Sequence, residues 1–218
     1  MNLLHKSDIT LSLVNKNLNQ GDIMPIEVDY FYIEEKILLI RELYAEDDYN
    51  SGIKEALSLM DELFKEPARS KYYASLCKLL ALGYRKSNKA KQALQILDRA
   101  INYTSKQFNK TKKESWEKEI AILHVNKGIV YENTKNYIGA INEYLHAERI
   151  FSKLNDTKHL FLLYQTLAGT YISTERFNEA TKILISMNEL AQEAGLDSDG
   201  QIRTMINQTI KEKTHESY

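Results

Sequence analysis

One spacing recurs three times along the chain and limits what it can fold into. A small residue and an aromatic stand three apart; eight residues later come a small, a large and a further apolar residue. Positions three, four and seven apart share one face of an α-helix, so each copy predicts two facing helices. The copies are Ala81-x2-Tyr84-x8-Ala93-x3-Leu97-x2-Ala100, Gly128-x2-Tyr131-x8-Ala140-x3-Tyr144-x2-Ala147 and Ala168-x2-Tyr171-x8-Ala180-x3-Leu184-x2-Met187.

The small residues indicate where the two helices approach each other most closely. Antiparallel helices pack about 8–10 Å apart, and closer where the contact residues lack bulk. A glycine inside a helix costs about 1 kcal/mol relative to alanine, which favours a packing role for Gly128. The same reasoning covers Ala81 and Ala168.

This register resembles the tetratricopeptide repeat (TPR). The resemblance implies an all-α fold, a right-handed α-solenoid of antiparallel helical hairpins, and a surface that holds other proteins or peptides. Successive copies are 47 and 40 residues apart, from Ala81 to Gly128 to Ala168, against about 34 in the shortest form of the family. We expect the excess between hairpins, in Ser105–Lys113 and around Asn155–Leu160. Repeats of this length resemble those of the bacterial peptide receptors of the Rap and PlcR type.

The register divides the chain into four parts. Residues 1–24 are expected to form a helix capped by Ser7 or Asp8, and 25–67 a degenerate first hairpin. In that hairpin Tyr44 takes the aromatic position, Arg41 replaces the small residue and Asp47–Gly52 lengthens the turn. Three repeats are expected within 68–195, as helices 69–86 with 89–106, 113–134 with 137–153, and 157–174 with 177–194. A capping helix and polar tail would occupy 196–218.

Composition argues against several classes of partner. The chain has 29 basic and 30 acidic side chains, a balance that gives no basic footprint for nucleic acid. Its single cysteine, Cys77, excludes an intrachain disulfide and is interpreted as an inert core thiol, the alternative being a reactive one. The N-terminal residues lack a secretory signal, and no apolar run approaches the roughly 18 residues of a membrane span. We therefore expect a cytoplasmic protein with no membrane or nucleic-acid partner.

The first helix of each pair is expected to line a concave groove. The register places a mixed set of side chains there, with a basic end, an amide in the middle and apolar walls. Asn126 could pair with a peptide backbone, as asparagines do in the receptors that this chain resembles; the alternative is that Asn126 and Asn133 are solvated surface amides. The groove set is Ser75, Lys78, Leu82 and Arg85, then Ile122, Val125, Asn126, Ile129 and Asn133, then Leu162, Gln165, Thr166, Gly169 and Ile172.

One known mode of TPR recognition is not predicted. Chaperone-binding members hold a C-terminal carboxylate with a Lys, Asn, Asn, Lys, Arg set on consecutive first helices. The matching positions here are Lys78, Leu82, Asn126, Leu162 and Thr166, so two of the five match and the Lys–Arg pair that should meet the carboxylate is absent.

Other chemistry is weakly represented. His124 and His146 lack further ligands at metal-binding spacing, and Asp197–Gly200 lacks the following acid of a calcium loop, so no metal is expected. Lys106, Lys110, Lys112 and Lys113 precede Trp116, but the glutamates that follow favour a solvated loop over base stacking. No phosphate-binding glycine loop, nucleophile elbow or paired acids occur, and no cofactor is expected.

Three functions remain open. The first is a non-enzymatic regulatory or sensor module that binds a peptide or protein segment in its groove. The second is a structural scaffold or assembly chaperone that uses the convex face; a homodimer through the terminal helices is also compatible with the array. The third is response-regulator dephosphorylation, which Rap-type proteins perform with a separate N-terminal bundle. Too few residues precede Pro25 to predict such a bundle.

Overall fold

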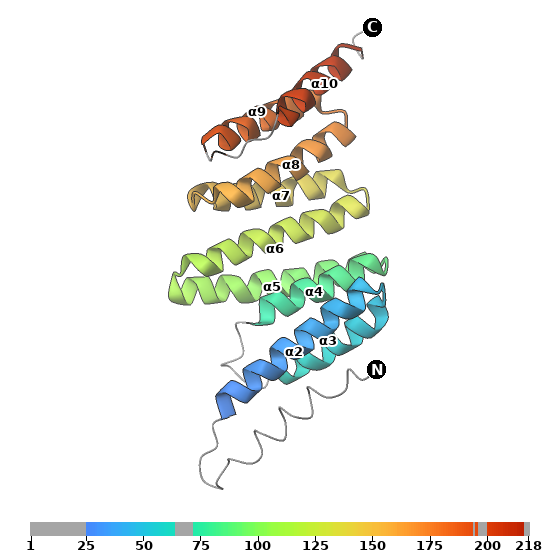
Figure 1. Ribbon diagram of the computed structural model, residues 1–218, viewed down its shortest axis with the longest axis vertical. Coiled ribbons are helices and arrows are strands. Elements are labelled where there is room, and N and C mark those ends of the chain that lie inside the picture. The colour runs from blue at the N-terminus through green and yellow to red at the C-terminus, as the bar shows by residue number, and fades with distance from the viewer. Residues whose placement is uncertain (1–24, 64–71, 194, 196–199, 216–218) are drawn as a thin grey trace, which may run out of the picture.

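The chain folds into a stack of antiparallel helices (Figure 1). The computed structural model describes residues 25–63, 72–193, 195 and 200–215, and the helix expected within 1–24 lies outside them. No β-strand occurs among the described residues. The helices, in chain order, are α2 (Pro25–Ala45), α3 (Tyr49–Leu63), α4 (Tyr73–Lys86), α5 (Ala90–Thr111), α6 (Glu114–Asn133), α7 (Tyr137–Lys153), α8 (Thr157–Ser173), α9 (Phe177–Glu193) and α10 (Gln201–His215).

Each hairpin turns through the same three-residue connection. Its middle residue is left-handed, with φ between 56° and 60° at Asp47, Asn88, Lys135 and Glu175. The next residue donates its N–H five residues back, as Lys89 does to the Tyr84 carbonyl at 2.8 Å. This is the Schellman arrangement that satisfies the last carbonyls of a helix. It recurs in all four turns, so the turns define the register of each hairpin independently of the side chains.

The turns correct the expected register of the first hairpin. Asp47 occupies the place of Asn88, so the turn between α2 and α3 is as short as the others rather than longer. Ile40 and Leu43 then match Ala81 and Tyr84, and Gly52 matches Ala93. Tyr44 is therefore one residue beyond the aromatic position, and Arg41 is not a substitute for the small residue.

Small residues of the second helices lie fully inside the stack. Ala93, Ala140 and Ala180 are each 0% exposed. Tyr84 and Tyr131 are half-buried, whereas the other predicted packing residues are buried. Those are Ala81, Gly128, Tyr144, Ala147, Ala168 and Tyr171. The core therefore runs between the layers of helices instead of around one centre.

The extra residues between repeats lengthen helices, which corrects the expectation of longer loops. α5 continues to Thr111, so only Lys112 and Lys113 join it to α6, and Trp116 lies in the first turn of α6. Similarly, α8 begins at Thr157, where the Asp156 carboxylate caps it by accepting from the His159 N–H at 3.2 Å. No glycine or proline interrupts 105–111, so nothing in the sequence stops α5 before Thr111.

The C-terminal end of the stack is covered by α10, which packs against α9. Ile202 and Thr209 are buried there, while Ile210 is exposed. Gly200, with φ of +73°, precedes the helix. No described helix is both long enough and apolar enough to cross a membrane.

Candidate functional site

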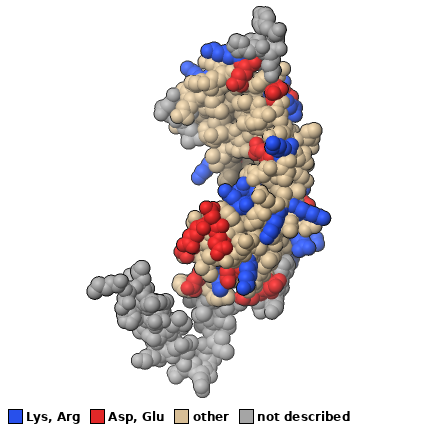
Figure 2. Space-filling model, turned by 90° about the vertical axis from the view of Figure 1, so that its right-hand side faces the viewer, with Lys and Arg blue, Asp and Glu red and all other residues tan. Residues whose placement is uncertain are grey.

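The molecule is curved, and its hollow side carries a cavity of about 290 Å³ (Figure 2). Three successive first helices, α2, α4 and α6, line it, because α2 contacts α4 and α4 contacts α6. The lining residues are Arg41, Ser75, Lys78, Leu79, Ala81, Leu82, Arg85, Asn126, Ile129 and Val130.

Six residues of the predicted groove set meet at this cavity. They are Ser75, Lys78, Leu82, Arg85, Asn126 and Ile129, contributed by α4 and α6. The three remaining residues on α6, Ile122, Val125 and Asn133, lie outside the cavity, the first two half-buried and the third exposed.

The cations of the cavity differ in how they are paired. Lys78 forms an ion pair with Glu119, Nζ to Oε1, at 2.6 Å. In the orientation of the Asn133 amide that satisfies both of its polar groups, its oxygen accepts from Arg85 Nη1 at 3.2 Å and its nitrogen donates to the Ile129 carbonyl at 3.2 Å. Arg41 makes no ion pair or hydrogen bond with another described residue.

Asn126 uses only part of its hydrogen-bonding capacity on the described residues. Its Nδ2 donates to the Ile122 carbonyl at 2.8 Å within α6. A primary amide offers two donor hydrogens and an acceptor oxygen, so one N–H and the oxygen stay available. Leu79, Leu82 and Ile129 supply the apolar walls beside it.

The predicted groove residues on α8 form a separate, shallower surface. Leu162 is 52% exposed and Gln165 is exposed, while Ile172 is half-buried. The Thr166 hydroxyl is occupied within its own helix, where it donates to the Leu162 carbonyl at 3.1 Å. An added Cβ at Gly169 would meet no atom within 4 Å, so this part of the groove is open. α8 is joined to α6 through Thr170, which donates to Glu132 at 2.9 Å.

Sequence reasoning missed Arg41. Aligned by the turns, Arg41 takes the place of Leu82, Ile129 and Gly169, which is a groove position. The mistaken register had put Arg41 on the packed face instead. The signal that could have found it was Gly52, a small residue at the correct distance after Leu43.

His124 and His146 belong to a charged cluster between α6 and α7. His124 Nδ1 lies 2.6 Å from Glu143, and Lys127 bridges Glu143 and Asp98 at 2.9 Å each. Burial opposes the charge of Glu143, but bonds from His124 and Lys127 outweigh it and lower the pKa of that carboxyl. The His146 ring stacks on His124, with centroids 5.2 Å apart. Among the described residues no three ligating side chains gather as a metal site.

Comparison of the sequence with protein-family models and with curated proteins gives no match. Several solved structures are similar. The putative kinesin light chain of Podosopora anserina, described as having nearly identical TPR-like repeats, has a TM-score of 0.66 and 12% identity over 85% of this chain and 89% of that chain. Aspartyl phosphate phosphatase F of Bacillus subtilis has a TM-score of 0.65 and 13% identity over 84% of this chain and 50% of that chain.

The apo form of RapI is similar as well. Its TM-score is 0.62 with 18% identity, over 91% of this chain and 72% of that chain. The identities are low, so these likenesses concern the fold. The chain is therefore a TPR-like helical solenoid whose fold resembles that of the Rap proteins.

Proposed function

We propose that this chain is a non-enzymatic regulatory or sensor module that binds a peptide or protein segment in its concave groove. The observation that supports the proposal is the cavity itself, which takes side chains from three consecutive hairpins. Apolar walls, an amide with spare capacity and cations line one surface, the mixture that peptide sites use for affinity and orientation. The TPR-like fold supports a binding role.

The groove offers a bound segment two contact regions. Leu79, Leu82 and Ile129 form the apolar part of the cavity, with Asn126 placed to pair with a backbone amide. On α8, exposed Leu162 and Gln165 extend the surface along the stack. A segment that lies across the first helices would contact both regions.

A display library of short random peptides tests the proposal. Peptides enriched on the wild-type chain are measured against a groove variant, Lys78→Ala with Asn126→Ala and Gln165→Ala. The control variant changes three exposed α5 residues, Lys91→Ala, Gln92→Ala and Gln95→Ala. We expect binding to be lost in the first variant and kept in the second, with both melting cooperatively. Enriched peptides that bind the groove variant as tightly as wild type would refute the proposal.

A scaffold or assembly-chaperone role is the second candidate, and exposed apolar residues on the second helices favour it. Ile138 on α7 is 77% exposed and Ile185 on α9 is 45% exposed. Light scattering measures the molar mass of the wild type and of Ile138→Ser. A wild-type oligomer that this substitution converts to a monomer would favour the scaffold role.

A phosphatase role is a third candidate, favoured by the similarity to aspartyl phosphate phosphatase F. This chain spans half of that protein, so its activity does not follow from the likeness. Loss of aspartyl phosphate from a purified response regulator on adding this chain would establish it. An unchanged rate of dephosphorylation would leave the binding role.

A further inference from the structure

Two arginines in the cavity have guanidinium N–H groups available for a ligand. We propose that Arg41 and Arg85 hold the carboxylate of an acidic residue in the bound segment, a residue flanked by apolar side chains. This rests on the groove being the binding surface, as proposed above, and names the ligand chemistry that its centre selects.

The charges of the cavity leave it cationic. Lys78 is balanced by Glu119 at 2.6 Å and so adds little to the attraction of an anion. Arg85 uses one N–H on the Asn133 amide, and a guanidinium carries five. Arg41 uses none on the described residues. The unbalanced positive charge therefore comes from two arginines that reach one cavity from different helices, α2 and α4.

A carboxylate matches these donors better than other acceptors do. The planar guanidinium presents parallel N–H groups that a carboxylate accepts as a pair, and charge-assisted bonds of this kind are about twice as strong as neutral ones. Leu79, Leu82 and Ile129 line the same cavity as the arginines and suit the methylene groups of an Asp or Glu side chain. A neutral amide in the same place would leave both guanidinium groups without a counter-charge.

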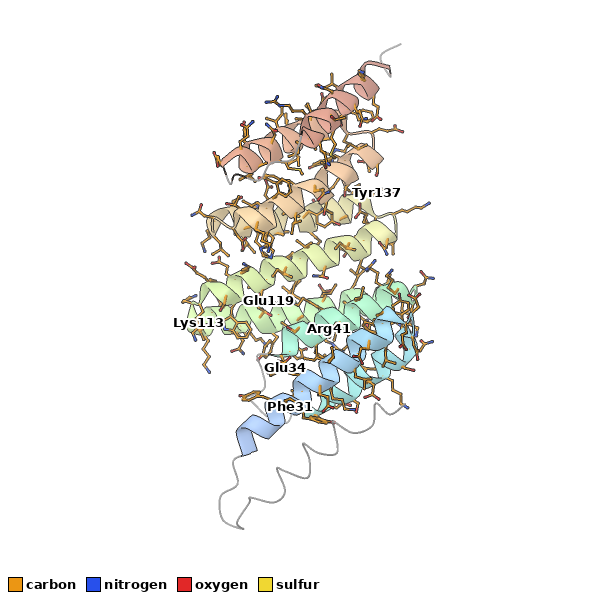
Figure 3. All side chains as sticks on the ribbon, viewed as in Figure 1. Phe31, Glu34, Arg41, Lys113, Glu119 and Tyr137 are labelled. Carbon is orange, nitrogen blue, oxygen red and sulfur yellow. The ribbon has the colours of Figure 1, made fainter. Side chains whose placement is uncertain are left out.

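The surroundings limit how acidic the segment can be. Glu34 and Glu42 are exposed on α2 on either side of Arg41, and they would repel neighbouring carboxylates. Figure 3 shows Phe31, Glu34 and Arg41 along α2. Phe31 is 73% exposed and Leu38 is 55% exposed. Lys36, the other cation of α2, is paired with Glu55 at 3.0 Å. The helix thus offers apolar contacts next to one cation, Arg41, that has no ion pair among the described residues, which favours one acid between apolar residues over an acidic run.

Fluorescein-labelled peptide mixtures test the proposal by anisotropy. One mixture carries a central Glu between randomised apolar residues, and matched mixtures carry Gln or phosphoserine there. Each is made with a free and an amidated C-terminus. We expect the Glu mixture to bind about tenfold or more tighter than the Gln mixture whichever terminus it carries. The preference should disappear in Arg41→Gln with Arg85→Gln and persist in Arg149→Gln, an exposed arginine on α7.

The remaining outcomes separate the two proposals. Groove-dependent binding of Glu and Gln mixtures with equal affinity would overturn the carboxylate site and leave the binding function. Tighter binding of the phosphoserine mixture, or a preference that needs the free C-terminus, would also overturn it. If the double variant unfolds, the single variant Arg41→Gln replaces it, because Arg41 is exposed and its substitution should not disturb the fold. The preference for the Glu mixture should be weaker in that variant than in wild type. Failure of every peptide to bind in a groove-dependent way would remove the binding function itself.

Discussion

Gly128 lies directly against the ring of Tyr144. A Cβ on Gly128 would stand 2.6 Å from Tyr144 Cδ1 and closer still to Cε1. The ring cannot move aside easily, because Tyr144 is fully buried and its hydroxyl donates to Glu132 at 3.0 Å. Glu132 in turn accepts from Thr170 on α8 at 2.9 Å. One missing side chain thus permits a contact that links α6, α7 and α8.

Gly128→Ala should therefore destabilise the fold by about 1–3 kcal/mol, since the overlap exceeds the gain in helix propensity. Gly169→Ala is the matched control, because its added Cβ meets nothing within 4 Å. That change should raise the free energy of unfolding by about 0.5–1 kcal/mol. Urea denaturation measures both. Equal stabilisation by the two substitutions would contradict the contact between Gly128 and Tyr144.

The sequence predicted the hairpins well where its pattern allowed one register. Tyr84 and Tyr131 have no adjacent aromatic or leucine that could take their place. Leu43 and Tyr44 do compete, since both are large and adjacent, and a one-residue shift changes which side of α2 Arg41 occupies. The left-handed turn at Asp47 decides between them. A backbone conformation of this kind is not visible in the side-chain pattern.

The cavity was less predictable than the stack for a related reason. The register placed Leu82 and Ile129 on the concave face, and the structure places both at the cavity. Which groove residues enclose a volume depends on how close neighbouring helices come, and no residue pattern encodes that distance. Leu162 shows the difference: it follows the same register on α8 but is exposed, outside the cavity.

Tyr44 and Tyr144 provide a comparison of two buried hydroxyls. The Tyr44 hydroxyl has no hydrogen-bond partner among the described residues, whereas that of Tyr144 donates to Glu132. A buried polar group without a partner costs free energy, so Tyr44→Phe should leave stability unchanged or raise it by up to about 1 kcal/mol. Tyr144→Phe should cost about 1.5–3 kcal/mol, the value of a bond to a charged acceptor. Thermal unfolding separates them; equal losses would contradict this difference.

Asp156 should make stability depend on pH in the acid range. Burial opposes its ionisation, but hydrogen bonds from Lys118 and His159 outweigh this and lower its pKa to about 2. A lowered pKa means that its contribution is complete above the ordinary value and is lost as pH falls through about 2.

Asp156→Asn isolates that charge effect, because the amide oxygen can still cap α8. The difference in free energy of unfolding between wild type and variant should be constant above about pH 5 and shrink from about pH 4 to 2. Asp156→Ala should cost about 1 kcal/mol more, because it also removes the cap. Urea titrations at each pH measure these differences. A constant difference down to pH 2 would show that the ionised carboxylate is not stabilised.

His146 should act at milder acidity. Partial burial and the neighbouring His124 lower its pKa, so the folded state binds its proton less readily than the unfolded chain does. Stability is therefore complete above the ordinary histidine pKa of about 6.5 and falls as the pH drops below it. His146→Gln should flatten this loss while leaving stability at pH 8 little changed. Parallel pH profiles for wild type and variant would argue against a lowered pKa.

Cys77 should be unreactive in the folded chain. Burial raises the pKa of its thiol to about 12, and the side chain is inaccessible on α4. Since the thiolate is the nucleophile, both factors suppress its reaction with Ellman's reagent. Gln92→Cys adds an exposed thiol on α5 as an internal reference. We expect that variant to react in two phases, one immediate and one limited by opening of the fold, with denaturant merging them. Immediate reaction of both thiols of the native variant with the reagent would instead identify Cys77 as a reactive, accessible group.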